Sequence, residues 1–74
     1  MIAWLLIETA GTDVKEKLRS VSLSNAKQLV EGSVGKEVIV HVQSTTLKDL
    51  NVALGVFASV AGVKSVSTLR VRPV

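Results

Sequence analysis

Few residues of this chain can do chemistry, and they are scattered. The chain has one histidine, His41, and neither cysteine nor tyrosine. A serine nucleophile needs a histidine base held by an acid, and no serine lies in the strand-turn-helix elbow that exposes such a nucleophile. A metal site needs further ligands, whereas His41 stands alone in the middle of a predicted strand. We therefore expect no catalytic residue, no metal ligand and no cofactor.

The glycine-rich segment Gly32-Ser33-Val34-Gly35-Lys36 is the clearest candidate for binding. It resembles a phosphate loop only in its glycines, because it joins two predicted strands and does not open a helix. We expect a hairpin turn there. Its backbone N–H groups, the Lys36 ammonium and the Glu37 carboxylate offer partners to both ends of a small zwitterion such as an amino acid.

Length and composition predict a single small domain over residues 1–74 that associates with itself. Hydrophobic residues make up 47% of the 74 residues, and a chain of this size has only a thin core in which to bury them. The absence of cysteine favours a reducing compartment. The apolar run 1–7 is far shorter than the ~20 residues of a membrane span and lacks the basic start of a signal peptide. We expect a soluble cytoplasmic protein, and the net charge of +3 alone identifies no partner.

Hydrophobic periodicity and turn residues predict the order strand, helix, strand, strand, helix, strand. The expected strands are Ala3–Ile7, Ala26–Glu31, Glu37–Gln43 and Val63–Val71, and the expected helices start after a cap at Thr12 or Asp13 and after Ser44-Thr45-Thr46. The first helix carries Val14, Leu18 and Val21 on one face, with Asp13 and Glu16 spaced as in a capping box. The second carries Leu47, Leu50, Leu54, Phe57 and Ala61 on its core face, ends at Gly62, and has a further apolar arc of Val52, Val56 and Val60.

This order predicts an α+β, ferredoxin-like βαββαβ sandwich whose antiparallel sheet has both helices on one face. Strand 37–43 alternates, with Val38, Val40 and Val42 on one side. In the last strand we expect Val63, Leu69 and Val71 on one side and Val66, Thr68 and Arg70 on the other. The first strand is apolar on both faces, so the open sheet face should be buried by a second copy.

RNA recognition motifs share this order but stack bases on aromatic side chains of their third strand. Strand 37–43 has no Phe or Tyr, and Phe57 belongs to the helix core. Lys64, Arg70 and Arg72 are interpreted as a solvated edge that discourages aggregation. We therefore expect no direct contact with nucleic acid and none with membranes.

The chain resembles the effector module of Lrp/AsnC-type transcription regulators, known as the RAM domain (regulation of amino-acid metabolism). The similarity covers nearly the whole chain and is carried by Trp4-Leu5-Leu6-Ile7-Glu8, Val30-Glu31-Gly32, Gly35-Lys36-Glu37-Val38-Ile39-Val40-His41-Val42, Leu47 to Leu54 and Gly62-Val63-Lys64-Ser65-Val66-Ser67-Thr68-Leu69. In that family the module follows a DNA-binding helix-turn-helix domain. No residues remain for one here, so the chain is similar to stand-alone RAM-domain proteins.

The resemblance implies a dimer formed through the sheets, further assembly into tetramers or rings, and amino-acid effectors bound between dimers. It assigns Gly35 and the adjoining backbone to the effector carboxylate, Glu37 to its ammonium group, and Ser67 or Thr68 to hydroxyl contacts. This sequence departs from the family pattern at Glu37, where Asp is commoner, at Val66, where Thr is common, and in a hairpin about two residues longer.

We therefore expect a non-enzymatic, oligomeric sensing module for a small amino-acid-type effector. The resemblance implies that it modulates Lrp/AsnC-type regulators by mixed assembly with a full-length relative. Two alternatives stay open: a small enzyme of the dimeric α+β barrel type, with His41 as its acid or base, and a ligand-free oligomerisation module.

Overall fold

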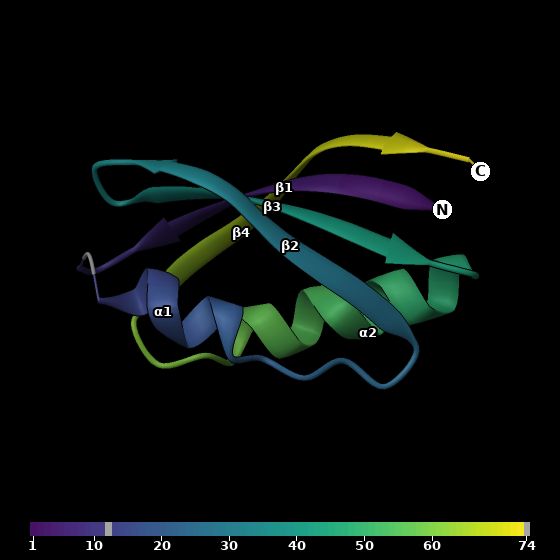
Figure 1. Cartoon of the computed structure of the whole chain (residues 1–74), viewed down its shortest axis with the longest axis horizontal. Coiled ribbons are helices and arrows are strands. Elements are labelled where there is room, and N and C mark those ends of the chain that lie inside the picture. The colour runs from purple at the N-terminus through teal and green to yellow at the C-terminus, as the bar shows by residue number, and fades with distance from the viewer. Residues whose placement is uncertain (12, 74) are drawn as a thin grey trace.

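The computed structural model describes every residue of the chain except 12 and 74 (Figure 1). Across this part of the chain it contains four strands and two helices. Their bounds are β1 Ile2–Thr9, α1 Val14–Arg19, β2 Ala26–Val34, β3 Glu37–Ser44, α2 Leu47–Ala58 and β4 Val63–Arg72. The predicted order of elements is confirmed, and each strand is longer than predicted.

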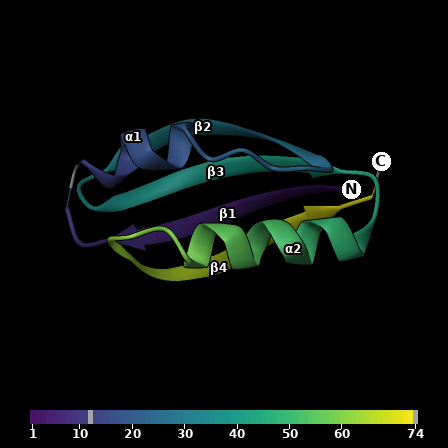
Figure 2. The ribbon, with the colours of Figure 1, turned by 90° about the horizontal axis from the view of Figure 1, so that it is seen from below.

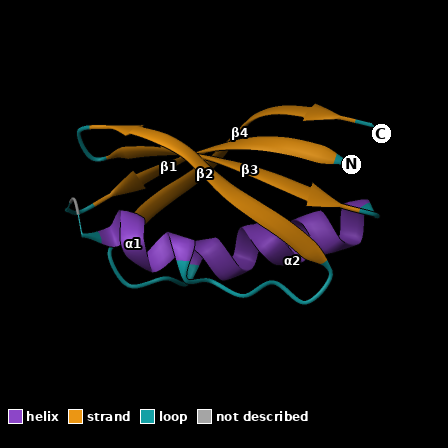
Figure 3. Ribbon diagram, in the orientation of Figure 1, coloured by secondary structure: helices purple, strands orange, loops and turns teal. Residues whose placement is uncertain are grey.

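The strands form one antiparallel sheet in the order β2-β3-β1-β4. Figures 1 and 3 show both helices beneath this twisted sheet, and Figure 2 shows α1 beside β2 and α2 beside β4. The arrangement is the α+β architecture that the sequence predicts and is compatible with a ferredoxin-like fold. Neither helix of the described chain is long and apolar enough to cross a membrane.

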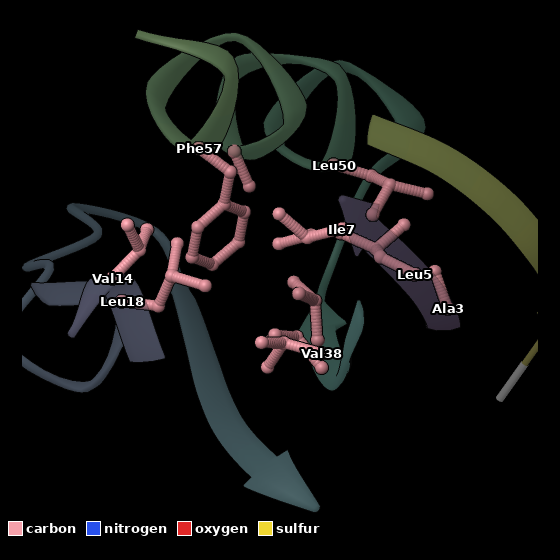
Figure 4. Close-up of a cluster of buried hydrophobic side chains, with 11 residues drawn as sticks. Ala3, Leu5, Ile7, Val14, Leu18, Val38, Leu50 and Phe57 are labelled. Carbon is pink, nitrogen blue, oxygen red and sulfur yellow. The ribbon is translucent and has the colours of Figure 1, made fainter. Parts of the chain in front are cut away.

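The hydrophobic core lies between the sheet and the helices (Figure 4). Alternate residues of the two central strands point into it, as the period of two in a strand requires. They are Ala3, Leu5 and Ile7 of β1 and Val38, Val40 and Val42 of β3. The helices add Val14 and Leu18 from α1 and Leu50, Ala53 and Phe57 from α2. The alternation predicted for strand 37–43 is confirmed.

Helix α2 begins where its cap dictates. The Asp49 backbone N–H donates to the Thr46 side chain at 3.1 Å, which satisfies one of the free donors of the first turn. Leu50 and Phe57 are buried as predicted, but Leu47 is 54% exposed and Ala61 lies beyond the end of the helix. The predicted core face therefore included one residue too many at each end, Leu47 and Ala61.

Helix α1 is only six residues long and depends on packing more than on its ends. Asp13 is its N-cap residue, but its side chain makes no capping hydrogen bond, so the predicted capping box does not form. The alternative cap, Thr12, lies outside the described residues. Val21 follows the helix and still packs against the core.

Strand β2 runs on to Val34, past the predicted end at Glu31. The register shifts between Val30 and Gly32, so Glu31 is an extra residue in the strand. The turn to β3 is then only Gly35 and Lys36. Gly35 has a φ of 59°, which suits the glycine at the first central position of a tight hairpin turn.

Strand β4 differs from the predicted alternation because its pairing with β1 shifts register twice, between Trp4 and Leu5 and between Glu8 and Thr9. A shift of one residue reverses the faces that follow it. Val63 and Val66, predicted on opposite sides, therefore both pack against the core.

The other sheet face is covered by no element of the described subunit, although β1 presents Ile2, Trp4 and Leu6 there. These side chains are half-buried by their neighbours, whereas Leu5 and Ile7 are fully buried on the helix side. We expected both sides of this strand to be covered, and within the described chain the helices and core cover one side.

Candidate functional site

The structure places the four residues expected to bind a ligand on two sides of the sheet. Gly35 lies in the hairpin turn, and Glu37 begins β3 directly opposite Glu8 of β1. Ser67 pairs with Leu6 and shares the open face with Glu37, whereas Thr68 pairs with Leu5 and lies on the helix side. One subunit therefore brings Gly35 and Glu37 together and leaves Thr68 apart from them.

A shallow hollow of about 360 Å³ lies at the end of the sheet beside Glu37. It is lined by Glu8, Thr9, Lys36, Glu37 and Lys64. The register of β1 and β3 sets Glu8 and Glu37 directly opposite each other, an arrangement of like charges that costs stability unless cations lie nearby. Lys36 and Lys64 supply those cations at the rim.

The turn that carries Lys36 is tied to β1 by Thr9, a buried residue. Both the backbone N–H and the hydroxyl of Thr9 donate to the carbonyl oxygen of Lys36, each at 2.8 Å, and the hydroxyl also lies 3.0 Å from the Gly11 carbonyl oxygen. The backbone of the hollow is therefore held by hydrogen bonds, while its charged side chains are exposed.

None of the described charged groups that line the hollow forms an ion pair with another. The only ion pair within the described residues joins Glu16 and Arg19 on α1, at 3.2 Å. The two carboxylates and two ammonium groups at the sheet end are therefore available to a ligand that carries both charges. Sequence reasoning identified Lys36 and Glu37 but missed Glu8 and Lys64, which only the register of the strands brings to the hollow.

The open sheet face carries an aromatic and cationic cluster around Trp4. The rings of Trp4 and His41 lie 5.3 Å apart, with 34° between their planes. The guanidinium carbons of Arg70 and Arg72 each lie 5.7 Å from the centre of the Trp4 ring, within the range of a cation–π interaction. We refer to Trp4, His41, Arg70 and Arg72 as the Trp4 cluster.

The Trp4 cluster changes two interpretations of the sequence. Arg70 and Arg72 are exposed on an edge strand, as expected, but their guanidinium groups also lie over an indole ring. His41 was not counted among the stacking residues, yet it lies beside Trp4 on the central strands. The cluster forms because Trp4 of β1 pairs with His41 of β3 on one side and with Arg70 of β4 on the other. The sequence alone does not indicate these pairings.

An apolar hollow of about 310 Å³ adjoins the Trp4 cluster on the same face. Leu6, Val34, Glu37 and Ile39 line it, and Val34 is 82% exposed. Leu29, which pairs with His41, is 60% exposed. Side chains of this kind are seldom left in water together on one side of a sheet.

The alternative enzyme was expected to use His41 as its acid or base. His41 lies on the open face against Trp4, whereas the space between the sheet and the helices is filled by the hydrophobic core. Within residues 1–11 and 13–73, no three side chains of the types that bind metals lie together.

The fold and these surfaces define the class of the protein: a small α+β module with one uncovered sheet face that carries an apolar patch among polar side chains, and a charged hollow at the end of that sheet. Comparison with protein-family models, curated proteins and solved structures gives no match.

Proposed function

We propose that this chain is a non-enzymatic module that pairs with a second copy through its open sheet face and binds a small zwitterion at the sheet end. The observation that carries the proposal is a patch of apolar side chains on a face that no described element of the chain covers. Apolar side chains from three strands meet there: Ile2, Trp4 and Leu6 of β1, Ile39 of β3, and Leu29 and Val34 of β2. Removing such a surface from water is the main favourable term in association.

The size of the face suits a modest homodimer. Four strands about 4.8 Å apart and eight residues long at about 3.4 Å each cover roughly 19 by 27 Å, or ~500 Å² per copy. Two copies would then bury about 1,000 Å², which is near the lower limit of specific interfaces. Pairing should therefore depend on concentration.

Sedimentation of the whole chain over a range of concentrations tests this proposal. A mass that rises from one chain to two supports it. A single-chain mass at the highest concentration that stays in solution would overturn it. The aspartate variant Ile39→Asp places a charge in the middle of the face and should shift the equilibrium toward the monomer.

The ligand is proposed to be an amino acid or a related molecule. Its ammonium group would lie by Glu8 and Glu37, and its carboxylate by Lys36, Lys64 and the Gly35 backbone. Ser67 or Thr68 would offer hydroxyl contacts from a neighbouring dimer. Exposed charge pairs contribute only about 0–1 kcal/mol each, so a lone subunit should bind weakly. Calorimetric titration with a panel of amino acids, with Glu37→Gln as the variant, is the test. If Glu37→Gln left the heat of binding unchanged, the hollow would not be the binding site.

The resemblance to the RAM domain extends the proposal to regulation. A module that pairs through its sheet could join a full-length Lrp/AsnC-type regulator by the same face and alter its assembly in the cytoplasm. Co-expression of the chain with such a regulator should then yield a mixed complex, and complete separation on purification would contradict this part. Ile39→Asp is the matched control, because it should abolish mixed assembly and self-pairing together.

The Trp4 cluster favours a second candidate function. An indole and an imidazole on the two central strands, flanked by two arginines, form the kind of surface on which single-stranded nucleic acid stacks. Titration with a short single-stranded oligonucleotide distinguishes the candidates. Quenching of Trp4 emission that weakens as salt rises would favour nucleic acid, and unchanged emission would favour pairing.

A further inference from the structure

We infer that two copies pair with the twofold axis running across the strands, so that the strands of the facing sheets run in opposite directions. This inference rests on the proposed pairing of the open faces and adds its geometry. Two aligned sheets related by a twofold axis have two arrangements, with the axis parallel to the strands or perpendicular to them. The positions of the large side chains and of the charges separate the two.

The positions of the large side chains favour an axis across the strands. Trp4 and His41 pair in register on one side of the sheet centre, and Leu6 and Ile39 pair two residues further along on the other side. An axis across the strands, passing between these rows, lays the Trp4 and His41 rings of each copy over the apolar hollow of the other. An axis along the strands lays the rings over rings and the hollow over the hollow, which leaves a void.

The edge strand β2 follows the same pattern. Leu29 pairs with His41, and Gly32 pairs with Ile39. An axis across the strands places the exposed Leu29 of one copy over Gly32 of the other. A side chain at Gly32 would have no neighbour within 4 Å in the subunit, so this space is free to receive the leucine.

The distribution of charges on the face favours the same axis. One end of the face carries Lys27 and Arg72, which flank the row of Ile2 and Gln43, and the other end carries Glu8 and Glu37. An axis along the strands sets Lys27 over Arg72 and Glu37 over Glu8. An axis across the strands instead brings each basic end to the acidic end of the other copy.

Two lysines also lie at the acidic end of the face. Lys36 and Lys64 line the hollow at the acidic end and offset part of its negative charge. They lie at the turn and at the register shift of β4, at the margin of the face, whereas the two glutamates belong to the central strands. In this geometry the basic end of the second copy lies beside the hollow, so ligand binding and pairing are linked.

Distance measurements between spin labels test the geometry, and the chain contains no cysteine to interfere with labelling. Gln43 and Ser67 are both exposed on the open face, so each is replaced by cysteine in turn. With sheets about 10 Å apart, an axis across the strands predicts backbone separations of about 23 Å for the Gln43→Cys pair and about 12 Å for the Ser67→Cys pair. An axis along the strands predicts about 11 Å and about 18 Å.

The order of the two distances therefore decides the inference. A longer distance at position 43 than at position 67, together with protection of Trp4 from acrylamide in the dimer, supports it. The reverse order overturns the geometry and leaves the proposed pairing intact. A dimer in which Trp4 stays accessible to acrylamide would be paired through the edge strands of the sheet. A monomer would show no coupling between the spin labels. Either result overturns both the proposed pairing and its geometry.

A charge reversal gives an independent sign. Lys27→Glu should weaken pairing a few-fold if the axis runs across the strands, because Lys27 then lies near Glu37 of the other copy. It should strengthen pairing if the axis runs along the strands, where Lys27 lies over Arg72. Lys17→Glu, the same change on exposed α1, is the control and should leave the dissociation constant within twofold of the original.

Discussion

Gly62 joins α2 to β4, and replacing it with alanine should destabilise the fold for two separate reasons. Its φ of 93° is one that residues with a Cβ rarely adopt. A Cβ built there would also lie 2.6 Å from Cγ2 of Val14, a core residue only 2% exposed. Neither problem has a simple remedy, because moving Val14 disturbs the contact between α1 and the core.

Two other glycines separate these effects. Gly35 has a φ of 59° but open space around its Cβ position, so Gly35→Ala should show the backbone cost alone, about 1–2 kcal/mol. Gly55 lies inside α2 with open space and ordinary φ, so Gly55→Ala should stabilise the fold by about 0.5–1 kcal/mol. Gly62→Ala adds the cost of overpacking, which brings its total to roughly 2–4 kcal/mol.

Thermal and urea unfolding of the four proteins measure this series. In a domain of this size about 1 kcal/mol moves the Tm by roughly 4–8 °C, so Gly62→Ala should lower it by at least about 8 °C. Gly55→Ala should raise it by a few degrees. If Gly62→Ala unfolded with Gly35→Ala, the close approach of Gly62 to Val14 would be refuted, and if it unfolded with the original protein, the backbone argument would fail as well.

Three further predictions concern pairing, capping and the hairpin tether. Ile39→Asp should raise the dissociation constant of the dimer at least tenfold in sedimentation equilibrium. The same change at Val52, which is 52% exposed on α2, should leave the dissociation constant unaltered. Equal effects of the two variants would place the interface elsewhere. Thr46→Ala removes the cap of α2 and should cost about 1 kcal/mol in urea unfolding, while Thr45→Ala on the adjacent exposed residue should cost almost nothing. Thr9→Val keeps the shape of a buried side chain but removes its hydroxyl donor, so it should cost about 0.5–1.5 kcal/mol and speed amide exchange in the turn after β2; unchanged exchange would mean that the backbone hydrogen bond alone holds the turn.

The central part of the fold could be predicted from the sequence because local signals agreed there. Val38, Val40 and Val42 alternate with semi-polar residues, and a strand with that pattern has one choice of buried face. Leu50 and Phe57 lie two helical turns apart to within about 20°, and Thr46 marks where that helix begins. Each signal lies within a few residues of the element it specifies.

The faces of β4 and the candidate site could not be predicted because they depend on partners distant in the sequence. The register shifts opposite Trp4 and Glu8 come from pairing with β1, some sixty residues away, and nothing within Val63–Arg72 marks them. The meeting of Glu8 with Glu37, and of Trp4 with His41, follows from the same long-range register. Sequence reasoning could recognise the residue types but not their neighbours.

The pairing of the open sheet face is tested most directly by the accessibility of Trp4, the only tryptophan of the chain. Acrylamide quenching of its emission should be measured from concentrations well below to well above the association midpoint, beside the mass in solution. The quenching constant should fall several-fold as the mass doubles, because the indole ring becomes enclosed between two sheets. A quenching constant that stays the same, whether the mass doubles or not, would contradict the account.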